Sequence, residues 1–211
     1  MDERPAYLAV EGLIGAGKTT FTKRLAERWN ARLVLEGFEE NPFLPRFYAE
    51  PDRYAFPVEL SFLAQRYHQL KGAGDRDLFQ PNTIADYSLG KSLVFSSVTL
   101  RDDEQELFKE LYNIMYAGLP KPDLLLYLHV PMEQVRARIR SRGRDYEQGI
   151  GEDYLLQLQE RYLDHLRQSP DQRILIVDVG MHDLLHDVAA FDRMLGHITR
   201  PAAERYRNIT L

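Results

Sequence analysis

The feature that most constrains this 211-residue chain is a segment near its N-terminus, Gly12-Leu-Ile-Gly-Ala-Gly-Lys-Thr19. It completes the Walker A pattern, in which glycines let the backbone wrap around an anion so that its N–H groups point inward. The segment follows an apolar strand-like run and precedes a helical pattern, whose N-terminus adds partial positive charge. A glycine-rich turn without a ligand is disfavoured, because the pattern is complete and both flanks fit. We expect a nucleotide phosphate-binding loop made by Gly12, Gly15, Ala16, Gly17, Lys18, Thr19 and Thr20.

Within this loop two side chains have distinct expected roles. Lys18 is expected to reach the β and γ phosphates, and the Thr19 hydroxyl is expected to reach Mg²⁺. A loop of this kind occurs in GTPases, motors, transporter ATPases and small-molecule kinases. The rest of the sequence has to decide among them.

The pattern of apolar residues predicts an α/β fold, with a five-stranded parallel sheet flanked by helices in a single domain over residues 1–211. Short apolar runs alternate with helical periodicity, and two of the runs are nearly all apolar, which is typical of strands covered on both faces. The predicted strands are Tyr7–Glu11, Arg32–Leu35, Thr83–Asp86, Asp123–His129 and Arg173–Val177. The predicted helices are Thr19–Trp29, Tyr54–Leu70, Asp103–Tyr116, Met132–Arg142, Asp153–Gln168 and Leu184–Leu195.

The composition of the chain excludes several classes of ligand and partner. The chain has no cysteine, which excludes disulfides and thiolate metal sites, and its six histidines lack metal-ligand spacing. A net charge of −5 argues against nucleic acid as a partner. No apolar run follows the acidic N-terminus as a signal peptide would require, and the longest run, Leu124–Leu128, is too short to cross a membrane. We therefore expect a cytoplasmic protein whose partners are small molecules, with no nucleic acid or membrane involved.

Four arginines crowd into one short segment, at Arg138, Arg140, Arg142 and Arg144. A solvated surface run normally mixes both signs, and a helix dipole favours one or two cations at a helix end rather than four. Guanidinium groups bind phosphate oxygens bidentately and stabilise charge on a phosphoryl group in transfer. The cluster predicts a lid at about residues 138–151. In it Arg142 and Arg144 contact the transferring phosphate, Arg138 lies one turn earlier, and Arg140 lies off that face.

Several further segments resemble the deoxynucleoside kinase family, the group that contains deoxycytidine, deoxyguanosine and deoxyadenosine kinases. The resemblance covers nearly the whole chain and is strongest to the bacterial purine deoxynucleoside kinases. The resemblance includes the phosphate loop, Glu11 before it, and the lid segment Arg142–Gly149. The other segments are Leu35-Glu36, Glu40-Asn-Pro-Phe-Leu44, Tyr54-Ala-Phe-Pro-Val-Glu59 and Ala85-Asp-Tyr-Ser-Leu-Gly-Lys-Ser92. It implies a P-loop kinase fold with an Arg-rich lid. It also implies transfer of the γ-phosphoryl group of ATP, with Mg²⁺, to the 5′-hydroxyl of a deoxynucleoside in nucleotide salvage.

The resemblance also implies roles at the reacting end. Glu36 ends the second predicted strand, at the edge of a parallel sheet where ligands bind, and it would be the general base for the 5′-hydroxyl. Position alone leaves a surface glutamate equally open. Asp86 ends the third predicted strand and would support Mg²⁺ together with Thr19, the alternative being a turn-capping aspartate.

The acceptor site is implied in the same way. Tyr48 and Glu147 would hold the sugar 3′-hydroxyl and leave little room for a 2′-hydroxyl, although a tyrosine at such a position is more often core. Glu59 and Arg66 lie seven residues apart, on one face of a predicted helix, and would read the base. A structural ion pair between them is the alternative, and two turns is a long span for it. Phe38 and Phe79 are left out of the site, because aromatic residues at such positions are usually core.

This chain departs from the family pattern at two positions. An acid-Arg-Ser triplet is common after the third strand, whereas here the triplet is Asp86-Tyr87-Ser88, so that one arginine is missing and Lys91 is a candidate to replace it. Glu59 stands where many relatives carry a base-reading glutamine. An ionised Glu59 accepts hydrogen bonds and Arg66 donates them, which favours a purine, deoxyguanosine ahead of deoxyadenosine.

Two other functions remain open on the sequence. A nucleoside monophosphate kinase of the thymidylate kinase type shares the loop, lid and sheet, but Glu36 would repel an acceptor that already carries a phosphate. A non-catalytic nucleotide-binding subunit should have lost Lys18, Glu36 or a lid arginine, and all are present. A homodimer is implied by the resemblance, and a heterodimer with a related kinase chain is also compatible with it.

Overall fold

The computed structural model of the chain describes residues 4–38, 41–75, 78–200 and 204–211. The acidic N-terminal residues and Glu40, the first residue of one family-like segment, lie outside these ranges. The strands are β1 (Tyr7–Gly12), β2 (Arg32–Val34), β3 (Thr83–Ala85), β4 (Leu124–His129), β5 (Ile174–Asp178) and β6 (Tyr206–Thr210). The helices are α1 (Lys18–Trp29), α2 (Leu44–Ala49), α3 (Pro51–Leu70), α4 (Gly90–Thr99), α5 (Asp102–Tyr116), α6 (Met132–Arg142), α7 (Glu152–Arg167) and α8 (Val188–Thr199).

The strands form one parallel sheet in the order β2-β3-β1-β4-β5-β6. The predicted parallel α/β architecture is confirmed, but the predicted number of five strands is wrong. The additional strand, β6, pairs with β5 from Ile174 opposite Tyr206 to Asp178 opposite Thr210. It lies at the edge of the sheet and is rich in polar residues, so no apolar run marks it in the sequence.

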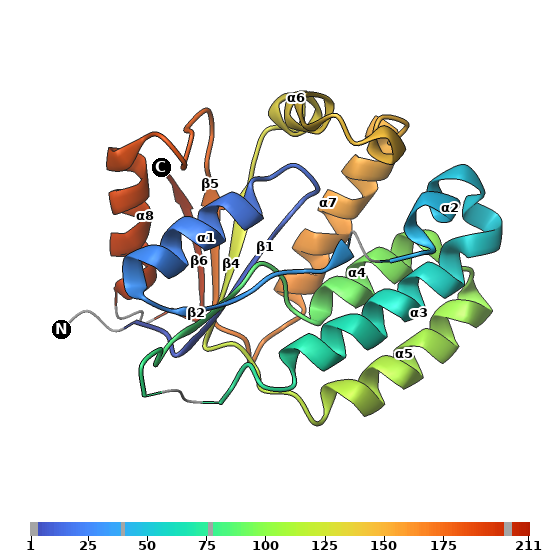
Figure 1. The fold of residues 1–211 in the computed structure, drawn as a ribbon, viewed down its shortest axis with the longest axis horizontal. Helices are drawn as coiled ribbons and strands as arrows, with labels where there is room; N and C mark the ends of the chain where they lie inside the picture. The colour runs from blue at the N-terminus through green and yellow to red at the C-terminus, as the bar shows by residue number, and fades with distance from the viewer. Residues whose placement is uncertain (1–3, 39–40, 76–77, 201–203) are drawn as a thin grey trace.

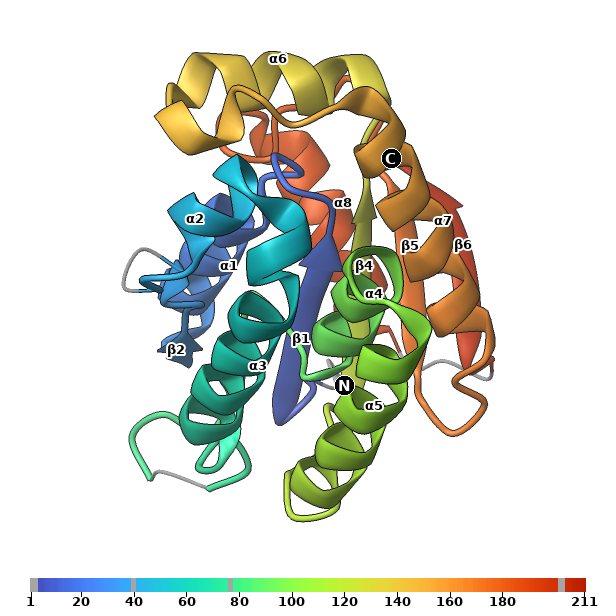
Figure 2. The ribbon, with the colours of Figure 1, turned by 90° about the vertical axis from the view of Figure 1, so that its right-hand side faces the viewer.

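Helices cover both faces of the sheet (Figure 1). Helices α1 and α8 lie on one side, α3, α4, α5 and α7 lie on the other, and α6 crosses the edge of the sheet at the top of Figure 2. Strand β1 divides its side chains between the two layers: Leu8 and Val10 join the core under α1 and α8, while Tyr7 and Ala9 join the core under α3 and α5. This alternation follows from the two-residue period of a strand.

Two helices were not predicted, and the boundary of a third is shifted. Helix α4 has the sequence Gly-Lys-Ser-Leu-Val-Phe-Ser-Ser-Val-Thr and packs between α3 and α7, so that it lacks a single apolar face. Helix α2 is only six residues long. Helix α8 begins at Val188 rather than Leu184, because the Asp187 side chain accepts a hydrogen bond from the Ala190 N–H at 2.9 Å and caps the helix there.

Candidate active site

The phosphate loop joins the end of β1 to the start of α1. Gly15 and Gly17 have positive φ angles of 82° and 89°, a backbone conformation that glycine adopts without steric cost. Lys18 closes the loop on itself: its Nζ donates to the Gly12 carbonyl oxygen at 2.8 Å and to the Leu13 carbonyl oxygen at 2.9 Å. The loop therefore has the shape of an anion cradle with an ammonium group at its rim.

Asp86 connects the phosphate loop to the end of β2. Its Oδ2 accepts a hydrogen bond from the Thr19 hydroxyl at 2.6 Å, and its Oδ1 accepts one from the Glu36 backbone N–H at 2.8 Å. The Thr19 hydroxyl and the Asp86 carboxylate are thus adjacent hard oxygen ligands beside the loop. Mg²⁺ usually takes one or two such protein groups and completes its octahedron with waters and substrate phosphates, so these two residues fit the ion.

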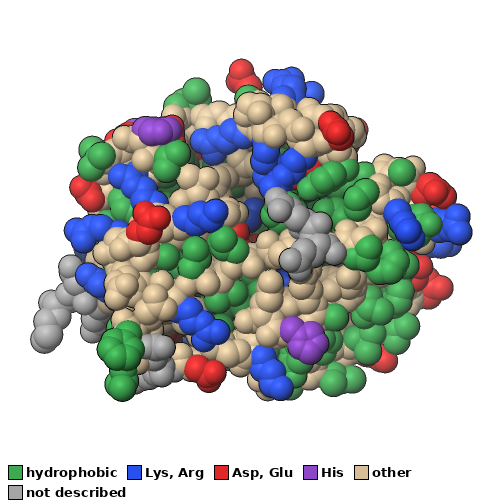
Figure 3. Space-filling view, viewed as in Figure 1, with side chains coloured by type: hydrophobic (Ala, Val, Ile, Leu, Met, Phe, Trp, Pro, Cys, Tyr) green, Lys and Arg blue, Asp and Glu red, His purple; other side chains and the backbone are tan. Residues whose placement is uncertain are grey.

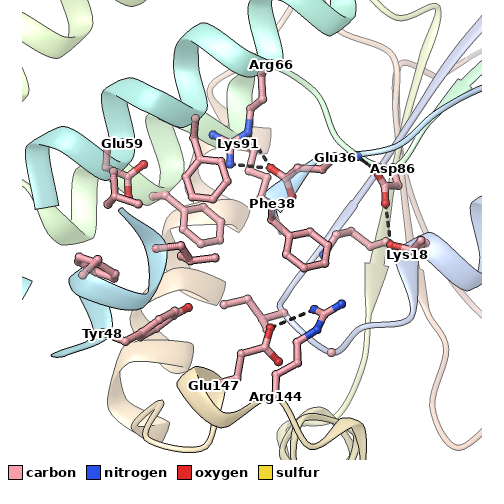
Figure 4. A pocket seen from close by; sticks show the side chains of 18 of the residues that line it. Lys18, Glu36, Phe38, Tyr48, Glu59, Arg66, Asp86, Lys91, Arg144 and Glu147 are labelled. Atoms are coloured by element: carbon pink, nitrogen blue, oxygen red, sulfur yellow. Dashed lines mark hydrogen bonds and ion pairs between the residues drawn. The ribbon is translucent and has the colours of Figure 1, made fainter. Parts of the chain in front are cut away.

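Glu36 lies between two cations (Figure 4). Arg66 donates a hydrogen bond through Nε to Oε1 at 2.8 Å, and one of its terminal nitrogens forms an ion pair with the same oxygen at 2.7 Å. Lys91 donates a hydrogen bond to Oε2. Burial raises the pKa of Glu36, but Lys91 and Arg66 outweigh burial and lower it to about 2. Glu36 is therefore an anion at every pH at which the protein would be assayed.

Lys91 is the residue that the sequence offered as a replacement for the arginine missing after the third strand. It is buried near the start of α4, and it lines the same pocket as Lys18 and Glu36. Burial lowers the pKa of Lys18 to about 8, and the nearby positive charge of Lys91 acts in the same direction. Two ammonium groups are thus held close together beside the phosphate loop, which favours an anionic ligand between them.

Glu11, the last side chain before the phosphate loop, is buried and links three elements beside the loop. Its Oε1 accepts hydrogen bonds from the Ser88 backbone N–H at 2.7 Å and from the Ser88 hydroxyl at 2.8 Å, and its Oε2 accepts one from the Tyr162 hydroxyl at 3.1 Å. Burial raises the pKa of Glu11. These contacts join β1, the segment after β3 and α7 at one point.

The arginine cluster forms the end of α6 and the turn after it. Arg138 reaches the phosphate loop, where it donates to the Ala16 carbonyl oxygen at 3.2 Å, whereas Arg140 is exposed. Arg142 and Arg144 both pair with Glu147, which lies in a 3₁₀ turn at Asp145–Glu147. In the space-filling view, Lys and Arg side chains gather below α6 and around the loop (Figure 3).

Tyr48 and Glu147 lie at the same end of the pocket (Figure 4). Tyr48 comes from α2, and its ring stacks on Tyr146 with ring centroids 5.9 Å apart. Glu147 is buried and is held by the two lid arginines. Burial raises the pKa of Tyr48, and the negative charge of Glu147 adds to this effect, so that the phenol remains a hydrogen-bond donor.

Glu59 and Arg66 both face the pocket from α3, but their partners differ. Arg66 is bound to Glu36 and donates to the Ser92 hydroxyl at 2.7 Å. Glu59 accepts a hydrogen bond from the Thr99 hydroxyl at 3.1 Å. These two hydrogen bonds engage two of the five N–H groups of Arg66, so the guanidinium retains donors for a ligand.

One pocket of about 780 Å³ brings these residues together. Sequence reasoning missed most of its apolar wall, because much of that wall comes from α2, α4 and neighbouring segments. The walls include Phe38, Leu44, Phe47, Val58, Phe62, Phe95 and Tyr154. Phe38, which we left out of the site, lies under the Arg144 guanidinium with 4.1 Å between the guanidinium carbon and the ring centroid. Phe79, which we also left out, is 83% exposed and does not line the pocket.

A second cavity of about 690 Å³ adjoins the other side of the phosphate loop. It is lined by Gly17 and Thr20 of the loop region, by Arg138, and by the segment Val179–Leu185 after β5. This cavity was not predicted, because the segment after β5 carries no motif.

Comparisons with known proteins show which family the chain matches. The model of a protein family described as deoxynucleoside kinase matches residues 8–201. A deoxyguanosine kinase of Bacillus subtilis is 34% identical over 198 residues, which cover 91% of this chain and 95% of that protein. A deoxyadenosine/deoxycytidine kinase of Bacillus subtilis is 27% identical over 203 residues, covering 92% and 91%.

A solved structure leads to the same family. The deoxyadenosine kinase of M. mycoides with bound dCTP superposes with a TM-score of 0.77 at 26% identity, covering 91% of this chain and 100% of that one. These relatives do not favour the nucleoside monophosphate kinase or the non-catalytic subunit that the sequence left open.

Proposed function

This chain belongs to the deoxynucleoside kinase family, and we propose that it transfers the γ-phosphoryl group of ATP to the 5′-hydroxyl of a purine deoxynucleoside, with deoxyguanosine preferred to deoxyadenosine. One observation carries the proposal: the phosphate loop, Glu36 and Glu59 all line the same pocket. Figure 4 shows Lys18 of the loop and Glu59 on opposite sides of the view with Glu36 between them. We assign the triphosphate to the Lys18 side, the reacting centre to Glu36 and the base to the Glu59 side.

The 5′-hydroxyl is placed against Glu36. Each carboxylate oxygen accepts more than one hydrogen bond, so Glu36 accepts one from the hydroxyl while it remains bound to Arg66 and Lys91. The 5′-oxygen forms the new bond to phosphorus as the bond between phosphorus and the β,γ-bridging oxygen breaks. Because Glu36 has a pKa of about 2, it is a weak base, and it takes the proton late, when the bond to phosphorus has made that proton acidic.

Cationic groups stabilise the charge that spreads over the phosphoryl oxygens. Lys18 and Arg138 are in place at the loop, and Arg142 and Arg144 would exchange Glu147 for phosphate oxygens on closure. Mg²⁺, which Thr19 and Asp86 would support, would neutralise charge on the β and γ phosphates. The cavity beside Thr20 and Arg138 has the position and size for the nucleoside of the donor.

We predict that the enzyme prefers a deoxynucleoside to the matching ribonucleoside by about one to two decades in kcat/KM. Tyr48 and Glu147 enclose the end of the pocket assigned to the sugar, and Tyr48 is fixed there by its stacking on Tyr146. A 2′-hydroxyl would have to displace this packed ring. The measurement compares deoxyguanosine with guanosine at saturating ATP–Mg²⁺, and Tyr48→Ala should narrow the difference. Equal kcat/KM values for the two nucleosides in the unmodified protein would contradict the sugar assignment.

We predict the order deoxyguanosine, deoxyadenosine and then the pyrimidines, assayed near pH 8. An ionised Glu59 accepts from guanine N1–H and the 2-amino group, and Arg66 donates to O6 and N7, whereas adenine and cytosine turn a ring acceptor toward the carboxylate. A buried mismatch of this kind costs roughly one to two decades in kcat/KM.

Initial rates with the four deoxynucleosides and with deoxyguanosine 5′-monophosphate test this order and the acceptor class together. A pyrimidine in first place would remove Glu59 and Arg66 from base reading. A preference for the monophosphate would overturn the proposed function itself.

The dimer and the cytoplasmic location expected from the sequence stay predictions. Within the part of the chain that the structure describes, no helix combines the length and the hydropathy needed to cross a membrane.

A further inference from the structure

One carboxylate oxygen of Glu59 accepts no hydrogen bond from the described part of the chain. The side chain is buried, with 3% of its surface exposed, at the base end of the pocket. Its Oε1 accepts a hydrogen bond from the Thr99 hydroxyl, but its Oε2, which is also buried, has no hydrogen-bond partner among the residues that the structure describes. Because buried polar atoms are nearly always hydrogen-bonded, this oxygen is suited to a group that the ligand supplies.

Groups of both charge signs surround this carboxylate. The titratable and charged groups that face it are Arg66 on α3, Lys91 on α4, Glu36 after β2, Tyr48 on α2 and Tyr154 on α7. Burial raises the pKa of Glu59 to about 7, Glu36 acts in the same direction, and Arg66, Thr99 and Lys91 oppose it. Burial also raises the pKa of both tyrosines, so they stay neutral. Glu59 is therefore present in both forms near neutral pH.

The two forms of Glu59 are complementary to different purines. The ionised carboxylate only accepts hydrogen bonds, which fits the N1–H and 2-amino donors of guanine. The protonated carboxyl donates through its O–H and accepts through its other oxygen, which fits the N1 acceptor and the 6-amino donor of adenine. The ionised carboxylate would place an acceptor against N1 of adenine, and the protonated carboxyl would place its O–H donor against a donor of guanine.

We propose that the protonation state of Glu59 selects the purine: the ionised form takes deoxyguanosine and the protonated form takes deoxyadenosine. This inference rests on the proposed function, in which Glu59 faces the base of the acceptor. The Glu59 proton stays on the enzyme in the deoxyadenosine complex and leaves to solvent before deoxyguanosine binds. Base selection is then a property of pH as well as of shape.

The first test is the ratio of kcat/KM for deoxyguanosine to kcat/KM for deoxyadenosine, measured from pH 6 to pH 8. Two forms related by one proton change this ratio by about tenfold per pH unit, so the ratio should rise up to about 100-fold across the range. Titrations common to both acceptors, including that of Lys18, cancel in the ratio. A ratio that stays constant within about twofold overturns the inference.

Two variants locate the proton. Glu59→Gln keeps the shape of the side chain but does not titrate, so its ratio should be independent of pH, and a pH dependence retained in this variant overturns the assignment to Glu59. Thr99→Val removes the hydroxyl that donates to Oε1 and stabilises the ionised form. The plot of kcat/KM for deoxyguanosine against pH should therefore have its midpoint at a higher pH in this variant than in the unmodified protein. A midpoint that is unshifted or lower counts against the inference.

The number of protons that the unmodified protein takes up or releases on binding a nucleoside tests the inference without a variant and without catalysis. Calorimetry in two buffers of different ionisation enthalpy should show proton uptake with deoxyadenosine at pH 8 and proton release with deoxyguanosine at pH 6. The same proton count for both nucleosides overturns the inference. If both are phosphorylated with a ratio independent of pH, the inference fails and the proposed function stands. If neither is phosphorylated, the proposed function fails as well.

Discussion

A Lys18→Ala variant is expected to fold and to lose at least about 10³-fold in kcat with every acceptor, because one cation on the transferring phosphoryl group is worth about that much. Lys18 is the ammonium group at the rim of the phosphate loop, where it bonds to the Gly12 and Leu13 carbonyl oxygens. In the complex these weak acceptors would give way to phosphate oxygens, so the interaction strengthens toward the transition state. The measurement is kcat with deoxyguanosine and ATP–Mg²⁺ in the purified variant.

Lys23→Ala is the matched control for Lys18→Ala. It removes the same charge from the same helix at an exposed position, and it should leave kcat nearly unchanged. Thermal unfolding of both variants separates a chemical defect from loss of the fold. A folded Lys18→Ala protein with appreciable activity would end the assignment of residues 12–19 as the catalytic phosphate loop.

A Glu36→Gln variant is expected to lower kcat by about 10²–10⁴-fold while the dissociation constant for deoxyguanosine changes by less than about tenfold. The amide keeps the shape of the side chain and one acceptor, so the hydroxyl still binds. It loses the negative charge that orients the 5′-hydroxyl and takes its proton. It also removes the anion that Arg66 and Lys91 bind. A phosphate oxygen would then attract these two cations.

The separation of kcat from binding distinguishes a catalytic Glu36 from a structural one. An equal loss in both quantities would mean that Glu36 only holds Arg66 and Lys91 in place. A nearly normal kcat would remove it from the mechanism. Glu27→Gln, an isosteric change at an exposed position on α1, serves as the control and should alter neither quantity.

The sequence and the structure agree best where a function is carried by one continuous segment. The conformation of the phosphate loop follows from its own glycines, and the arginine cluster at the end of α6 consists of four arginines within seven residues. Contacts between distant residues were harder to predict. Glu59 and Arg66 were expected to read the base because they share a helix face, and both line the pocket. The sequence did not indicate that Arg66 also binds Glu36, thirty positions away. Residues on one helix have a fixed spacing, whereas the partner of a buried charge depends on which other elements pack against it.

The sequence by itself determined the parallel α/β class, the phosphate loop and the family, because each depends on a local spacing of residues that backbone geometry converts into structure. The lid at about residues 138–151 stays a prediction. Only the tertiary structure decided how the acceptor end of the site is built. Helices α2 and α4 were not predicted, yet they supply Tyr48, Lys91 and the Thr99 hydroxyl on Glu59. The packing of α4 between α3 and α7 buries Glu59 and raises its pKa to about 7, and no described residue donates a hydrogen bond to its Oε2. Burial and electrostatic environment are properties of the assembled chain, since they are set by neighbours that sequence distance does not identify.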